Sequence, residues 1–343
     1  MSFRALFSSL LALVVCAGLM AGAEPVSVIF DTDMGNDIDD ALALAVLHAL
    51  ESRGEAKILA VTITKDNRWA APYVDLVNTF YGRGGIPVGM VRDGKTPKAS
   101  RMIQVPAERT RPDGTPVYPR RIQDPSQAPE AVSLLRRLLA GQPDGSVVFV
   151  QVGFSTNLAR LLDSAPDQAS PLTGRDLVAK KTRLLSVMAG NFADGSSEFN
   201  VREDVPSARK VFDEWPTPIV ASGFEIGRAL RFPARSIEND FAYVKDHPVA
   251  EGYRNYMKMP YDRETWDLTS ALYAVRPDRD YFSLSPPGKI GALEKGRTKF
   301  EPRPGGQHRY LILDDMRKAR TLEALVLLAS QPPQRMGPEQ RLE

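Results

Sequence analysis

The sequence predicts an α/β protein built on an open, mostly parallel β-sheet that is flanked by helices. Two observations predict this class. Short β-branched apolar runs alternate with helical patterns along the chain, and this alternation is typical of a parallel sheet whose two faces are both covered. The chain has 343 residues, of which 43% are hydrophobic, so it can bury a large core. We expect residues 24–343 to form a single domain.

The predicted elements follow one another in a regular order. The apolar run 26–30 predicts a buried strand, and the helix-forming residues from Asp40 onward predict a helix that packs on the sheet. Further strands are expected at 57–64, 86–91, 146–152, 183–188 and 218–222, and further helices at 70–81, 129–139, 155–162, 205–214 and 317–330. Residues 92–127 are rich in Pro, Arg, Gly and Asp, which predicts a long irregular loop over the site. Residues 288–313 predict a C-terminal β-hairpin.

Residues 1–23 are predicted to be a signal peptide. Arg4 supplies a positive charge, an apolar stretch follows that is short for a membrane span, and residues 21–23 form a small-residue cleavage site. We therefore expect an exported protein, periplasmic or extracellular, with no stable membrane association after cleavage. Cys16 is the only cysteine, and Val15 before it argues against a lipoprotein signal. Cleavage would leave no thiol for a disulfide or a cysteine-ligated metal.

The charge balance argues against one class of partner. The formal net charge is +2, and no run rich in lysine and arginine dominates any segment. A protein that binds a polyanion usually concentrates positive charge on one surface or segment. We therefore expect no nucleic-acid partner.

Five aspartates fall within ten residues directly after the first strand, namely Asp31, Asp33, Asp37, Asp39 and Asp40. Open parallel sheets bind their ligands beyond the carboxyl ends of the strands. Carboxylates this close repel one another unless a cation lies among them, and oxygen ligands favour Ca²⁺ or Mg²⁺. Helix capping would explain Asp39 and Asp40 but not Asp31 and Asp33. The cluster is therefore predicted to be a metal site.

Two other interpretations of the cluster fit the sequence less well. An EF-hand loop that began at Asp31 would need glycine at its sixth position and glutamate at its twelfth, where this chain has Asn36 and Leu42. A strand followed by Asp-x-Asp also resembles the haloacid-dehalogenase phosphatases, whose first aspartate is a nucleophile. Their fifth position is usually threonine or valine, and here it is Gly35.

The segment Asp31-Thr32-Asp33-Met34-Gly35, followed by Asp39-Asp40-Ala41-Leu42-Ala43, resembles the inosine-uridine-preferring nucleoside hydrolase family. Further segments match the family in the same order: Gly153 to Ala159, Val187 to Gly190, Glu198 to Asn200 and Trp266 to Ala271. The matches span residues 26–275. The resemblance implies a Rossmann-like fold and a Ca²⁺-dependent hydrolase that cleaves the N-glycosidic bond of a nucleoside or related riboside.

The resemblance also implies roles for individual residues. The implied calcium ligands are Asp33, Asp40, Asp267 and the backbone carbonyl of Thr156. The implied substrate-binding residues are Asp31, Asn67, Met188, Glu198, Asn200 and Trp266. Among these, Glu198 and Asn200 match the family residues that bind the ribose hydroxyls.

The spacing of the aspartates departs from the family pattern. The usual motif has one residue between the glycine and the Asp-Asp pair, whereas this chain has three, Asn36, Asp37 and Ile38. Counting forward from Gly35 makes Asp37 the catalytic base, and counting back from the helix makes it Asp39. We favour Asp39, because the helix fixes both members of the pair. Asp37 stays a candidate base or ligand.

A second departure concerns the leaving group. Trp266 stands where the family has a histidine that, in some members, helps to protonate the departing base. Tryptophan cannot donate that proton, although it can stack on a base. The three histidines of the chain, His48, His247 and His308, match no family position. The sequence therefore assigns no residue to leaving-group activation.

Other functions stay open at this point. A non-catalytic sugar- or nucleoside-binding protein could have the same calcium site, and the phosphatase interpretation is a further alternative. The expected partner is a small-molecule nucleoside or riboside. The sequence leaves the preferred base and sugar open, and also whether the chain forms a homo-oligomer.

Overall fold

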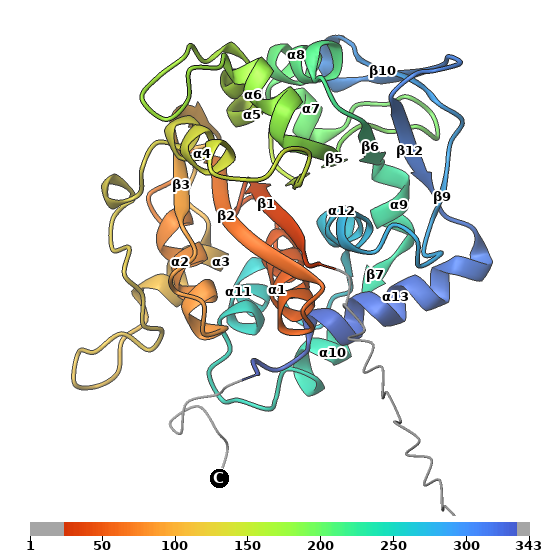
Figure 1. Cartoon of the computed structure of the whole chain (residues 1–343). Helices are drawn as coiled ribbons and strands as arrows, with labels where there is room; N and C mark the ends of the chain where they lie inside the picture. The colour runs from red at the N-terminus through yellow and green to blue at the C-terminus, as the bar shows by residue number, and fades with distance from the viewer. Residues whose placement is uncertain (1–23, 335–343) are drawn as a thin grey trace, which may run out of the picture.

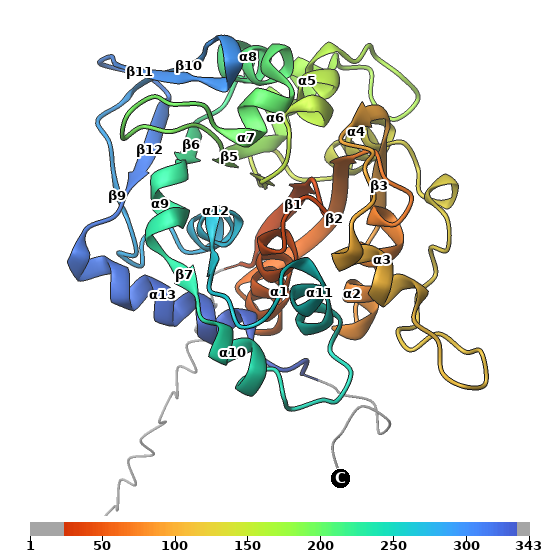
Figure 2. The same ribbon diagram turned by 180° about the vertical axis from the view of Figure 1, so that it is seen from behind.

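The structure is a computed structural model that describes residues 24–334, so the predicted signal peptide at 1–23 lies outside the described residues. A twisted sheet runs through the molecule, with helices on both faces (Figure 1, Figure 2). The predicted α/β class with an open, mostly parallel sheet is confirmed. Among residues 24–334, no helix has both the length and the apolar character needed to cross a membrane.

The main sheet has the strand order β11-β10-β12-β6-β5-β4-β1-β2-β3, with β9 paired to β12. Its strands are β1 (Val26–Thr32), β2 (Ala56–Lys65), β3 (Val88–Lys95), β4 (Val147–Gln151), β5 (Thr182–Met188), β6 (Ile219–Ser222), β9 (Ser283–Leu284), β10 (Gly288–Ala292), β11 (Thr298–Pro302) and β12 (His308–Ile312). The strands from β12 to β3 in this order are parallel. Outside this sheet, β7 (Arg231–Phe232) and β8 (Arg263–Glu264) form a short antiparallel ladder.

The helices are α1 (Asp39–Ser52), α2 (Ala70–Phe80), α3 (Arg101–Glu108), α4 (Ala131–Ala140), α5 (Thr156–Asp163), α6 (Gly174–Lys181), α7 (Phe199–Glu203), α8 (Val205–Glu214), α9 (Phe224–Ala229), α10 (Ala234–Asn239), α11 (Pro248–Tyr256), α12 (Trp266–Val275) and α13 (Asp315–Ala329). Helices α1, α2, α11, α12 and α13 contribute to the core on one face of the sheet, and α4, α5, α6 and α8 to the core on the other. Both views show α1 and α12 side by side next to β1 (Figure 1, Figure 2).

Strand β1 shows why consecutive residues of the predicted strands are apolar. Val28 and Phe30 pack into the core on the α1 face, whereas Ile29 packs into the core on the opposite face. All three are fully buried. Alternate residues of a strand point to opposite faces, so a strand covered on both sides needs apolar residues at every position.

Two parts of the chain differ from the expectation. The sequence predicts one β-hairpin over residues 288–313, but three strands lie there. Strands β10 and β11 pair antiparallel, whereas β12 pairs in parallel with β6, so it extends the main sheet instead of closing a simple hairpin. The region 92–127, predicted as an irregular loop, contains α3. Met102 and Ile103 of α3 are fully buried, and burial of this apolar face favours a helix among breaker residues.

His48 of α1 is buried and neutral in the folded protein. Its Nε2 lies 2.9 Å from Oδ1 of Asn78, and its ring stacks on Tyr81 with 4.6 Å between ring centroids. Burial, together with the charge of Arg83, lowers the pKa of His48 from 6.5 to about 3. Between these values the unfolded chain binds a proton at this position that the folded protein does not bind. His48 therefore makes folding less favourable as the pH falls below about 6.5.

The variant His48→Gln, which keeps a polar group beside Asn78, removes this titration. The difference in unfolding free energy between the wild-type protein and the variant should therefore change by about 1.4 kcal/mol per pH unit between pH 6 and 4, with the wild type losing stability faster. Urea unfolding of both proteins at several pH values measures this difference. A difference that is independent of pH would show that His48 is not held neutral.

Candidate active site

The candidate site is a cavity of about 370 Å³ at the carboxyl end of β1. Its acidic lining consists of Asp33, Asp37, Asp39, Asp40, Glu198 and Asp267. Its aromatic lining consists of Phe199, Phe224, Tyr256 and Trp266. Most of the residues predicted from the sequence thus lie around one cavity, although they come from segments far apart in the chain.

Two glycines allow close packing around the segment that carries Asp33. Gly35 has φ +113°, a backbone conformation that L side chains rarely adopt, and an added Cβ would lie 2.6 Å from Cδ1 of Ile103. A Cβ on Gly153, after β4, would lie 2.4 Å from the backbone nitrogen of Asp33. Both glycines stand in the motifs that the sequence singled out, and the close packing around them explains why no larger residue fits.

Three carboxylates converge on the floor of the cavity. Asp39 and Asp40 are the first two residues of α1, and Asp267 is the second residue of α12. Each is at least 95% buried, and one oxygen atom from each can be chosen so that all three lie within 4.8 Å of one another. The backbone N–H of Asp267 donates a hydrogen bond to Oδ2 of Asp39 at 3.1 Å.

Burial and mutual repulsion destabilise the charged form of these three groups. Burial is the largest cause that raises the pKa of Asp39, Asp40 and Asp267 well above its usual range. Repulsion from neighbouring aspartates raises each pKa further. A divalent cation among the three oxygens would remove both penalties. The donor set, which contains only hard oxygen atoms, suits Ca²⁺ or Mg²⁺.

Asp33 lies beside this triad and has a cationic neighbour that the sequence did not indicate. Its Oδ2 accepts a hydrogen bond from Nδ2 of Asn36 at 2.6 Å, and burial is the main cause that raises its pKa to about 6. Nζ of Lys65, from β2, donates to Oδ1 of Asn36 at 2.7 Å and to the carbonyl of Thr96 at 2.6 Å. Lys65 is the last residue of β2, and its position one residue beyond the predicted strand at 57–64 did not indicate this contact.

Glu198 and Asn200 form one wall of the cavity. The Glu198 carboxylate caps α7 by accepting hydrogen bonds from the backbone N–H groups of Asn200 and Val201, at 2.8 and 3.1 Å. Burial raises its pKa to about 7. Nδ2 of Asn200 donates to the carbonyls of Val152 and Met188, at 2.7 and 3.1 Å. These contacts fix the two side chains, and Met188, from β5, also lines the cavity.

Three residues predicted for the site do not line the cavity. Asp31 is fully buried and accepts hydrogen bonds from Oγ1 of Thr62 and Nδ2 of Asn157, while burial raises its pKa to about 7. Nδ2 of Asn67 donates to the carbonyls of residues 97 and 98. Thr156 begins α5, and its Oγ1 donates to Asp204 at 2.6 Å. An aspartate as enclosed as Asp31 is badly placed to be the nucleophile that the phosphatase interpretation requires.

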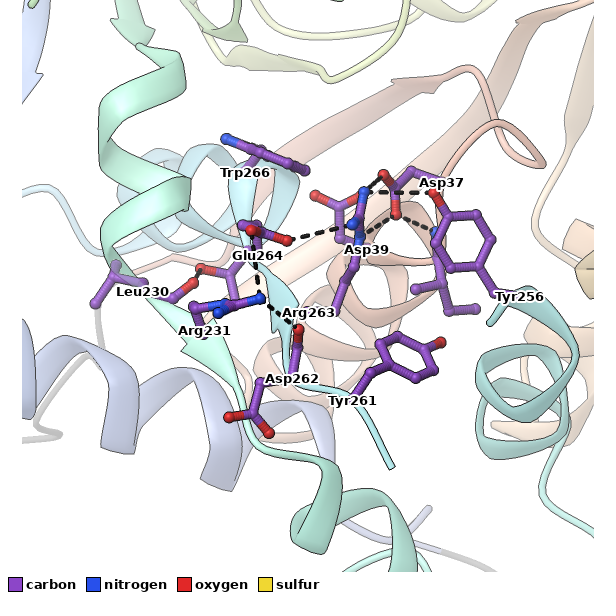
Figure 3. Close-up of polar contacts among 12 residues, drawn as sticks. Asp37, Asp39, Leu230, Arg231, Tyr256, Tyr261, Asp262, Arg263, Glu264 and Trp266 are labelled. Atoms are coloured by element: carbon purple, nitrogen blue, oxygen red, sulfur yellow. Dashed lines mark hydrogen bonds and ion pairs between the residues drawn. The ribbon is translucent and has the colours of Figure 1, made fainter. Parts of the chain in front are cut away.

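Another part of the cavity lining is aromatic and lies beside a partly buried cation, Arg263. The indole N–H of Trp266 donates to the carbonyl of Phe224 at 2.8 Å, and the two rings stack with centroids 5.3 Å apart. Arg263 lies between Trp266 and Tyr256 and forms an ion pair with Asp37 (Figure 3). No sequence signal pointed to Arg263, because its importance depends on contacts with residues far away in the chain.

The histidines do not supply the missing proton donor. His48 and His247 are buried in the core, and His308 lies in β12. None of the three lines the cavity. Polar groups beside its aromatic residues include the hydroxyl of Tyr256 and the guanidinium groups of Arg263 and Arg202.

The chain matches the family described as "Inosine-uridine preferring nucleoside hydrolase" over residues 28–322. No curated protein sequence matches it. Among solved structures, it is similar to a plant nucleoside hydrolase, with 20% sequence identity and a TM-score of 0.67 over 90% of this chain and 100% of that chain.

Two bacterial structures are similar to the same extent. An inosine-uridine preferring nucleoside hydrolase from Bacillus anthracis shares 17% identity, with a TM-score of 0.66 over 89% of this chain and 99% of that chain. A purine-preferring ribonucleoside hydrolase from Gardnerella vaginalis shares 14% identity, with a TM-score of 0.64 over 89% and 98%. These likenesses show a shared fold. Because the family match covers most of the sequence, the chain belongs to the inosine-uridine preferring nucleoside hydrolase family of enzymes.

Proposed function

We propose that this protein is an exported, calcium-dependent enzyme that hydrolyses the N-glycosidic bond of a ribonucleoside or a related N-riboside. The observation that carries the proposal is the convergence of Asp39, Asp40 and Asp267 in one cavity with a polar wall and an aromatic wall. The predicted signal peptide at 1–23 supports the proposal of export. The products would be the free base and the free sugar.

The acidic floor is the proposed metal site. Asp40 and Asp267 would be calcium ligands, with Asp33 beside them and the Thr156 carbonyl as the ligand that family resemblance suggests. A bound divalent cation would lower the pKa of a water molecule and orient the sugar hydroxyls. Asp39 completes the converging triad and is the proposed catalytic base.

Different residues around the cavity would activate the water, bind the sugar and contact the base. One carboxylate oxygen of Asp39 accepts a hydrogen bond from the N–H of Asp267, which orients the carboxylate to take a proton from the attacking water. Glu198 and Asn200, held by their backbone contacts, would bind the ribose hydroxyls while an oxocarbenium-like sugar forms. Trp266, fixed by its bond to Phe224, lines the cavity and would contribute to the aromatic surface that the base contacts.

The first prediction concerns the activity itself. The purified protein should release ribose from at least one nucleoside in a panel of purine and pyrimidine nucleosides. A calcium chelator should abolish this release, and added calcium chloride should restore it, because the bound cation would lower the pKa of the attacking water. A reducing-sugar assay measures the release. Tight ribose binding without release from any nucleoside would instead favour a non-catalytic binding protein.

The second prediction identifies the base. At saturating calcium, Asp39→Asn should lower kcat by about 10²- to 10⁴-fold, because the amide cannot accept the proton of the attacking water. Asp37→Asn at the same calcium concentration should lower kcat much less, since the ion pair with Arg263 occupies the Asp37 carboxylate. Steady-state kinetics of both variants, with circular dichroism as a check on folding, measure this contrast. The opposite order of effects would make Asp37 the base.

A further inference from the structure

One ion pair in the cavity lining joins the two acidic segments of the site. Nε of Arg263 donates to Oδ1 of Asp37 at 2.8 Å, and Nη2 donates to Oδ2 of the same carboxylate (Figure 3). The two residues are 226 positions apart in the sequence. Asp37 lies shortly before Asp39, and Arg263 lies shortly before Asp267. The pair therefore links the chain that enters α1 to the chain that enters α12.

The Arg263 side chain is held from several sides. Its Nη1 donates to Oε2 of Glu264 at 3.2 Å, and its Nη2 lies 3.3 Å from the hydroxyl oxygen of Tyr256. Its Cζ lies 5.2 Å from the ring centroid of Tyr256 and 5.1 Å from that of Trp266. The side chain is only 17% exposed. A guanidinium fixed in this way binds a carboxylate in one orientation, which a flexible ammonium group does not do.

The segment that carries Asp37 is also held in place; Asp37 is the middle one of the three residues that separate Gly35 from Asp39. On one side of Asp37, the Asn36 amide bonds to Asp33 and accepts a hydrogen bond from Lys65. On the other side, Ile38 is fully buried. The longer loop is therefore attached to β2 at one end and to the core at the other, and it presents Asp37 to Arg263.

We propose that Asp37 and Arg263 are positioning residues that hold Asp39 and Asp40 opposite Asp267, at the separation that one divalent cation requires. This inference rests on the proposed function. It assigns a role to Asp37, which lies in the segment by which this chain departs from the family spacing. Three buried carboxylates repel one another, and that repulsion tends to move their segments apart. A two-point ion pair close to both segments opposes this movement.

Arg263 could affect calcium binding through its charge alone or by positioning the ligands, and the two explanations predict opposite changes in calcium affinity for one substitution. Arg263→Gln removes a positive charge near the calcium site. If only charge mattered, the loss of a neighbouring cation would strengthen calcium binding. If the pair positions the ligands, its loss weakens calcium binding, by roughly 10- to 100-fold as for other groups that orient metal ligands. The direction of the change therefore distinguishes the two explanations.

The experiment is isothermal titration calorimetry of the full-length protein with calcium chloride, after treatment with a chelator. Arg263→Gln should weaken calcium binding. Arg263→Lys should also weaken it, because lysine keeps the positive charge but cannot form the two-point hydrogen bonds of a guanidinium. The double variant Asp37→Asn/Arg263→Gln restores the wild-type net charge and should still bind weakly. A matched control is Asp280→Asn, which breaks an exposed 2.7 Å ion pair with Arg317 outside the cavity and should leave the affinity unchanged.

Several outcomes would overturn the inference. These are tighter calcium binding by Arg263→Gln, wild-type affinity in the double variant, or no calcium binding by the wild-type protein. If circular dichroism shows that Arg263→Gln does not fold, the test rests on the milder variant Arg263→Lys. Unchanged calcium affinity in Arg263→Lys would contradict the positioning role. Nucleoside hydrolysis is measured on the same preparations. Absence of hydrolysis together with the expected calcium affinities would contradict the proposed function and leave the positioning role intact.

Discussion

The arrangement of the site depends on one constraint, which is that three buried carboxylates must be kept close together although they repel one another. Asp39 and Asp40 open α1, and Asp267 lies at the start of α12, so the packing of these two helices brings the charges together. The cores on both faces of the sheet hold the helices in place. Apolar burial thus stabilises a polar arrangement that would be unfavourable by itself without a cation.

The rest of the cavity is built around that acidic floor. Glu198 and Asn200 form hydrogen bonds with backbone groups, which orient both side chains in the absence of a ligand. Trp266 is the residue before Asp267, and its bond to Phe224 orients the aromatic wall relative to the floor. A ligand with a hydroxylated sugar and a flat apolar base matches this combination of surfaces.

Much of the fold and part of the site could be predicted from the sequence. The alternation of apolar strands and helices predicted the parallel sheet, and the motifs around Asp39 and Trp266 predicted residues that do line the cavity. The role of Arg263 could not be predicted, because it depends on a partner 226 positions away. Helix α3 was missed because its helical state depends on burial of a short apolar face in the core, which local composition does not show.

The most direct test of the central claim is a crystal structure of the protein grown with calcium chloride. We predict one calcium ion among the three carboxylates, with oxygens of Asp40 and Asp267 at about 2.3–2.6 Å from the ion and the Asp39 carboxylate beside it. The Asp37–Arg263 pair should remain closed beside it. A well-ordered structure with no ion among the three carboxylates, or with calcium bound elsewhere, would contradict the account.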